Sequence, residues 1–160
     1  TKDTLLTDAI VSFNTLKLYL FDNKFDKRLF VMGRSLGSAS AFHIAHSCEN
    51  EINGCIIESG FATEYSLLQL MNINPDSISY KLSDGFMNLS KLKDYTKPLL
   101  IIHSDMDDII PISQAEMIYL ESPSKNKDFF KVSGANHNNI LMIARNDYFI
   151  KIQSFIDGCI

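Results

Sequence analysis

Hydrophobic residues follow two spacings along the chain, and the two alternate. Short apolar runs predict buried β-strands at 28–32, 54–58, 98–103 and 128–132. Apolar residues three or four positions apart predict amphipathic helices at 4–20, about 36–46, about 113–121 and 140–156. Strands that alternate with helices favour a mostly parallel sheet with helices on both faces, an α/β fold with about four strands. The length of 160 residues suits a single domain over residues 1–160. Ser113 and Glu116 have capping-box spacing, so we expect them to open the third of these helices.

The first predicted strand runs directly into Gly33-Arg34-Ser35-Leu36-Gly37, a G-x-S-x-G sequence. This spacing is typical of a sharp turn from a strand into a helix that exposes a nucleophilic serine. We expect both glycines to prevent a backbone collision, while the strained turn holds the Ser35 hydroxyl outward at the strand tip. Ser35 is therefore the candidate nucleophile.

Two later loops supply the other groups that such a serine needs. The strand at 98–103 opens into an acidic loop that Pro111 closes, and the loop after 128–132 carries His137. The chain order is thus serine, acid, histidine. Because the carboxyl ends of parallel strands meet at one edge of a sheet, we expect the three groups to lie close together.

Three motifs resemble the α/β-hydrolase superfamily, in particular its uncharacterised single-domain serine hydrolases. They are Glu58-Ser59-Gly60-Phe61, Gly85-Phe86-Met87-Asn88-Leu89 and the segment from His103 to Pro111. The resemblance covers essentially the whole chain, and the order Ser, Asp, His is the order of that fold. It implies a serine hydrolase that cleaves small-molecule carboxylic esters or thioesters through an acyl-enzyme, without a metal or an organic cofactor.

Each member of this set has an expected role. Ser35 attacks the acyl carbonyl, and His137 accepts its proton and later returns it to the leaving group. Asp107 is the acid that the family pattern selects, because it lies four residues after His103 and four before Pro111. It is expected to hold the imidazole in one tautomer and to stabilise the imidazolium.

Neighbouring residues are expected to complete the site. The backbone N–H of Leu36 is the expected oxyanion donor, and Arg34 and Phe61 are expected substrate contacts. The remaining loop carboxylates, Asp105 and Asp108, are expected to be solvated.

Two further polar residues end strands at the same edge. We expect Glu58 to make structural hydrogen bonds and His103 to order the acidic loop. The segment 61–96 is longer than one connecting helix needs, and it is rich in apolar and aromatic residues. The resemblance implies that this segment is a cap-like insertion that covers the substrate pocket.

The chain departs from the family because only one helix precedes the nucleophile strand. The early strands, and the loop that gives the second oxyanion N–H, have no counterpart here, and the strand at 28–32 is expected to be an open edge. The intact triad segments favour the carboxy-terminal portion of a longer hydrolase. Two alternatives stay open: an assembly completed by a partner chain or a homodimer through the 28–32 edge, and an impaired hydrolase-like binding or interaction module.

Composition excludes several other function classes. A net charge of −4 disfavours nucleic acid and anionic membrane surfaces as partners, and no apolar run approaches the length that spans a membrane. Cys48, Cys55 and Cys159 are odd in number and lack metal-ligand spacing, so we expect reduced thiols and a cytoplasmic location.

Overall fold

A parallel four-stranded sheet forms the centre of the computed structural model, which describes residues 1–25 and 28–159. The strands are β1 (Phe30–Arg34), β2 (Gly54–Glu58), β3 (Leu99–Ser104) and β4 (Lys127–Val132). They pair in chain order, β1-β2-β3-β4, and every neighbouring pair is parallel. The predicted α/β class and the four strands are confirmed, although β1 starts and ends two residues later than predicted. The domain predicted over 1–160 includes residues 26, 27 and 160, which lie outside the described residues.

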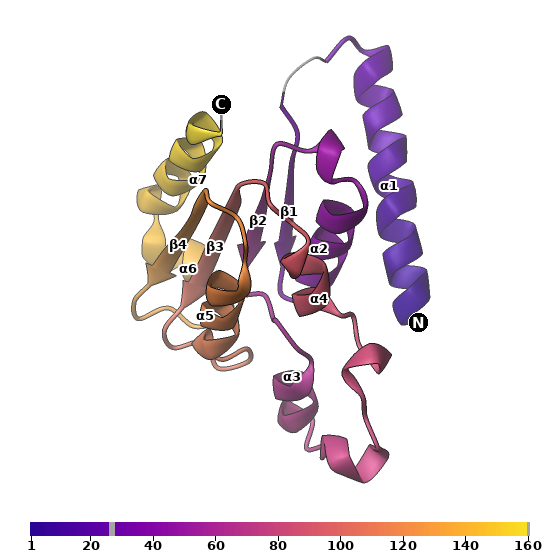
Figure 1. Cartoon of the computed structure of the whole chain (residues 1–160). Coiled ribbons are helices and arrows are strands. Elements are labelled where there is room, and N and C mark those ends of the chain that lie inside the picture. The colour runs from indigo at the N-terminus through magenta and orange to yellow at the C-terminus, as the bar shows by residue number, and fades with distance from the viewer. Residues whose placement is uncertain (26–27, 160) are drawn as a thin grey trace.

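Helices cover both faces of this sheet (Figure 1). On one side lie α1 (Lys2–Asp22), α2 (Gly37–Ser47), α4 (Asn88–Lys93) and α5 (Ile112–Glu121). On the other side lie α6 (Ile140–Ala144) and α7 (Asn146–Gly158). The remaining helical segments are α3 (Tyr65–Leu70) and the 3₁₀ turns η1 (Glu49–Glu51), η2 (Pro75–Ile78) and η3 (Leu82–Asp84). The predicted arrangement of helices on both faces is therefore confirmed.

The two central strands are buried along their whole length because each has helices on both sides. Alternate residues of β2 and β3 point to opposite faces, so Ile57 and Ile101 join the core under α2 and α5. Ile56 and Ile102 join the core under α6 and α7. Burying such side chains on both faces supplies most of the driving force for folding.

Two predicted helix details are wrong. The helix α5 begins at Ile112 with Pro111 as its N-cap and no side-chain cap bond, so Ser113 lies within the first turn and forms no capping box with Glu116. The predicted single helix over 140–156 is split, because Arg145 has φ +51° and ψ −125° between α6 and α7. Apolar spacing continues across this break, and therefore it could not reveal one residue that leaves helical geometry.

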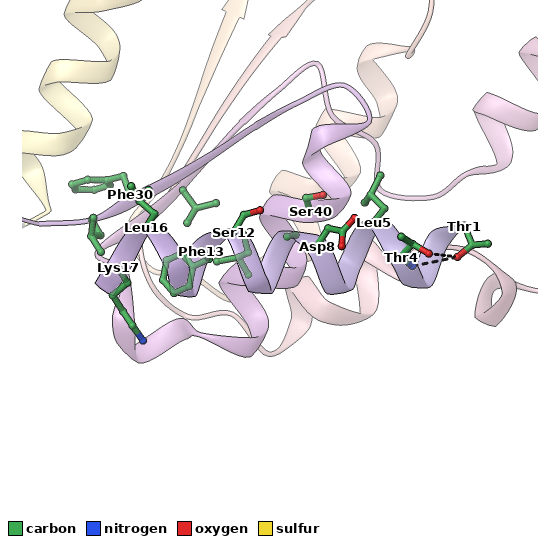
Figure 2. A pocket seen from close by; sticks show the side chains of 14 residues that line it. Thr1, Thr4, Leu5, Asp8, Ser12, Phe13, Leu16, Lys17, Phe30 and Ser40 are labelled. Carbon is green, nitrogen blue, oxygen red and sulfur yellow. Dashed lines mark hydrogen bonds between the residues drawn. The ribbon is translucent and has the colours of Figure 1, made fainter. Parts of the chain in front are cut away.

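At the edge of the sheet, β1 has only β2 as a neighbour among the described strands, as predicted. The first helix, α1, packs along α2 beside this edge (Figure 1). A groove of about 750 Å³ lies between α1, α2 and β1, and its lining includes Leu5, Phe13, Leu16, Phe30 and Val31 (Figure 2). Ser35, Asp107 and His137 are not among the residues that line it.

The two glycines of G-x-S-x-G differ in their surroundings. A Cβ on Gly33 would collide with the carbonyl oxygen of Gly37 and would lie 2.6 Å from the Cβ of Ala41, because α2 approaches β1 closely there. A Cβ on Gly37 would meet no atom within 4 Å. The expected steric requirement for glycine is thus confirmed at position 33 and wrong at position 37.

This difference predicts opposite outcomes for two alanine substitutions. Gly33→Ala should lower the free energy of unfolding by about 1–3 kcal/mol, because the added methyl group must push α2 away from β1. Gly37→Ala should not lower it, because the methyl group enters open space and alanine favours helix. Urea denaturation of both variants measures the effect, and equal stability of the two would contradict the packing described here.

Candidate active site

Ser35 directly follows β1 and occupies a strained backbone position. Its φ of +52° lies in the left-handed region, which residues with a Cβ seldom adopt. The Ser35 N–H donates a hydrogen bond to the carbonyl oxygen of Glu58, 2.9 Å away, at the end of the neighbouring strand. This bond and the close contact between Gly33 and α2 hold the turn in place.

The structure brings Ser35, His137 and Asp107 into one hydrogen-bonded chain. His137 Nε2 lies 2.9 Å from Ser35 Oγ, and His137 Nδ1 lies 2.9 Å from Asp107 Oδ2. A carboxylate only accepts hydrogen bonds, so Nδ1–H donates to Asp107 and the Ser35 hydroxyl donates to Nε2. The Asp107 side chain is fully buried, and His137 is nearly so.

Backbone donors fix the carboxylate of Asp107. Its Oδ1 accepts the N–H groups of Ile109 at 3.0 Å and Ile110 at 2.7 Å. His103, which is fully buried, contacts the same loop: its Nε2–H donates to the carbonyl oxygen of Ile110 at 2.8 Å. Burial lowers the pKa of His103, so its ring is neutral at neutral pH. The contacts of His103 are those of a residue that orders the acidic loop.

The other two loop carboxylates bind the segment that carries His137. Asp105 accepts hydrogen bonds from the Ser133 hydroxyl at 2.8 Å and the Gly134 N–H at 2.9 Å. These bonds, that of the Gly134 N–H first, lower the pKa of Asp105. Asp108 accepts the N–H of His137 itself at 3.3 Å. Both carboxylates are accessible to solvent, as expected, but each also binds the loop that carries His137, a contact that sequence reasoning missed.

Ser104, the last residue of β3, joins the two loops. Its buried hydroxyl donates to the carbonyl oxygen of Ala135 and accepts the N–H of Met106 at 3.1 Å. The acidic loop and the histidine loop are thus bonded to the same side chain.

A second polar cluster lies beside the serine. The Arg34 guanidinium donates to Glu58 Oε1 at 3.1 Å, to the carbonyl oxygen of His137 at 2.5 Å and to Asn138 Oδ1 at 3.1 Å. Glu58 Oε2 accepts the Tyr148 hydroxyl at 2.6 Å, and burial, followed by this carboxylate, raises the pKa of Tyr148. Glu58 thus makes the expected structural hydrogen bonds. Sequence reasoning missed Tyr148 because its position fits the apolar stripe of α7.

Phe61 is fully buried and packs with Ala39, Ile110 and the ring of Phe86, 6.0 Å away. Its contact with substrate stays a prediction, and this packing does not favour it.

Leu36, the expected oxyanion donor, is the N-cap of α2, where backbone N–H groups lack acceptors within the helix.

The part of segment 61–96 from α3 to η3 extends past the carboxyl ends of the strands, whereas α4 packs beside α2 (Figure 1). Ser35, Asp107 and His137 follow strands β1, β3 and β4 at that same end. The segment is held together internally by Glu64, which is buried and accepts the Phe86 N–H at 2.5 Å and the Tyr80 hydroxyl at 2.9 Å. Several of its apolar residues are exposed, among them Leu70, Met71 and Ile78.

Comparison with known proteins shows which sequences and structures this chain resembles. No family model matches the chain. It is 26% identical over 132 residues to an α/β hydrolase domain-containing protein 17C of Xenopus tropicalis, covering 81% of this chain and 39% of that protein. The structure also matches that of a metagenome-derived lipolytic enzyme with a TM-score of 0.75, at 18% identity, over 99% of this chain and 74% of the other. The chain is thus similar to an α/β hydrolase in sequence and to a lipolytic enzyme in fold.

A third relative shows how much of a longer protein the chain spans. An uncharacterized membrane protein of Saccharomyces cerevisiae is 26% identical over 159 residues, which is 95% of this chain and 53% of that protein. The chain thus spans between two fifths and about half of these two relatives. Within residues 1–25 and 28–159, none of the helices has the length and apolar character needed to cross a bilayer.

The bonds of Ser104 predict a measurable cost when they are removed. Ser104→Ala should lower the free energy of unfolding by about 1–3 kcal/mol, because it leaves a buried carbonyl and a backbone N–H unpaired. Ser38→Ala is the matched control, since Ser38 is equally buried but its hydroxyl has no hydrogen-bond partner among the described residues. Chemical denaturation should show little or no loss for the control. A loss as large as that of Ser104→Ala would overturn this interpretation.

Proposed function

We propose that the protein is a serine hydrolase that cleaves carboxylic esters or thioesters through an acyl-enzyme on Ser35. The observation that carries this proposal is the hydrogen-bonded chain in which His137 lies 2.9 Å from both Ser35 Oγ and Asp107 Oδ2. A serine, a histidine and a buried carboxylate in this order are the groups that acyl transfer requires. The similarity to an α/β hydrolase in sequence and to a lipolytic enzyme in fold supports the proposal.

Proton transfer follows the direction of the two hydrogen bonds. Ser35 Oγ attacks the acyl carbon while His137 Nε2 takes the hydroxyl proton, and the Leu36 N–H donates to the developing oxyanion. The same proton passes from Nε2 to the leaving alkoxide or thiolate as the tetrahedral intermediate collapses. A water molecule then loses a proton to His137 Nε2 and attacks the acyl carbon. As the bond to Ser35 Oγ breaks and the acid leaves, Nε2 returns that proton to Ser35, and Asp107 stabilises the imidazolium in both acylation and deacylation. These steps use only side chains, a backbone N–H and water.

Esters and thioesters are favoured over amides because their leaving groups need less help from a general acid. The lipolytic enzyme with a similar structure is described as acting on lipids, which agrees with an ester substrate. We propose a cytoplasmic location on the basis of Cys48, Cys55 and Cys159, which are free and buried. The covering role of segment 61–96 belongs to the same proposal, whereas the expected substrate contact of Arg34 does not, because its guanidinium binds Glu58, His137 and Asn138.

Hydrolysis of p-nitrophenyl butyrate and of a butyryl thioester tests the proposal. Ser35→Ala should abolish turnover, and Asp107→Asn should lower kcat about 10⁴-fold, because it reverses the tautomer that His137 needs. Asp94→Asn is the matched control, since this carboxylate is largely exposed at the end of α4. It should keep the activity of the unaltered chain. Turnover that persists in Ser35→Ala would refute an acyl-enzyme on this residue.

A second candidate is a hydrolase-like interaction module that binds another strand through β1. The open edge of β1 and the groove beside it favour this function. It predicts dimers of this chain that form with rising concentration and are unchanged by Ser35→Ala. Sedimentation of both forms distinguishes the candidates. Monomers at all concentrations, together with ester hydrolysis that is lost in Ser35→Ala, would exclude it.

A further inference from the structure

We infer that Arg34 is a positioning residue that sets His137 against Ser35, an inference that rests on the proposed function. Arg34 directly precedes the nucleophile in sequence, but its side chain binds the loop that carries His137. Its guanidinium reaches the carbonyl oxygen of His137 at 2.5 Å and the side chain of Asn138 at 3.1 Å. One planar group thus connects the end of β1 to the loop that carries the histidine.

This contact binds the carbonyl oxygen of His137, which takes no part in the hydrogen bonds to Ser35 and Asp107. The imidazole is bonded to Ser35 and Asp107, and the His137 N–H donates to Asp108 at 3.3 Å. The carbonyl oxygen is the remaining polar group of the residue, and Arg34 binds it. With both main-chain groups bonded, the backbone that carries the ring is fixed, so the imidazole starts from one position relative to Ser35 and Asp107.

Glu58 holds the guanidinium in place and also touches the nucleophile. Its carboxylate is 8% exposed and accepts Arg34 Nε–H at 3.1 Å and the Tyr148 hydroxyl at 2.6 Å. Its backbone oxygen accepts the Ser35 N–H at 2.9 Å. Glu58 therefore links Ser35, through its main chain, to His137, through its side chain and Arg34. Displacement of one partner displaces the other.

Arginine suits this role because its planar fork offers several donors at fixed angles. Lysine would keep the positive charge beside Glu58, but a single ammonium group cannot donate hydrogen bonds to Glu58, His137 and Asn138 from the positions that the guanidinium nitrogens occupy. Misplacing a reacting group by about 1 Å can cost about 100-fold in rate, so a loosened histidine should lower kcat far more than it changes substrate binding.

Two variants and one matched control test this role. The double variant Arg34→Met/Glu58→Gln removes the fork without leaving a lone buried carboxylate, and Arg34→Lys keeps the ion pair without the fork. The control is Lys93→Met/Glu121→Gln, which removes an exposed ion pair of 3.3 Å between α4 and α5. If the double variant does not fold, Arg34→Lys still answers the question.

The first readout is the NMR signal of the carbon-bound Cε1 proton of His137, which needs no substrate. Both Arg34 variants should show microsecond-to-millisecond relaxation dispersion at His137, absent from the control and the unaltered chain. The signals of His43, His46 and His103 should stay unchanged, showing that the fold is intact. An undisturbed His137 signal in both Arg34 variants would overturn the inference.

The second readout separates positioning from binding and from the proposed function. In both Arg34 variants, kcat for p-nitrophenyl butyrate should fall about 10- to 100-fold while KM changes little. A rise in KM with unchanged kcat would assign Arg34 to substrate binding instead and would contradict positioning. If the unaltered chain hydrolyses no ester, the proposed function fails, and the His137 signal alone decides whether Arg34 holds the histidine.

Discussion

The close approach of α2 to the end of β1 is the constraint on which the candidate site depends. Because Gly33 has no side chain, the helix passes directly over the strand end, and the chain must turn sharply between them. Ser35 occupies that turn with a left-handed backbone, which costs energy that the surrounding packing must offset. Its N–H is held by the carbonyl oxygen of Glu58, so the position of the hydroxyl is set by two neighbouring strands.

The parallel sheet brings the remaining groups to the same edge. Ser35 follows β1, Asp107 follows β3 and His137 follows β4, so strand direction places three segments distant in sequence at the same edge of the sheet. Hydrogen bonds between the loops then refine this coarse placement. The carboxylates of Asp105 and Asp108 and the hydroxyl of Ser104 connect the acidic loop to the histidine loop.

The coarse features could be predicted from the sequence, because each has a local signal. Apolar runs revealed the strands, and G-x-S-x-G, the acidic loop and the histidine loop each follow one of them, so parallel strands place all three at one edge of the sheet. The finer contacts have no such signal. Asp105 and Asp108 look like surface carboxylates until the fold places loop N–H groups against them, and Tyr148 looks like any apolar residue of a helix. The break at Arg145 and the open space at Gly37 depend on tertiary packing in the same way.

Intact mass after incubation with a fluorophosphonate tests most directly whether these contacts activate Ser35. The reagent phosphonylates a serine only when a neighbouring base accepts its proton, and the stable adduct requires no knowledge of the natural substrate. The account predicts one adduct on the unaltered chain and none on Ser35→Ala. A folded chain that gains no adduct, or an adduct that persists in Ser35→Ala, would contradict it.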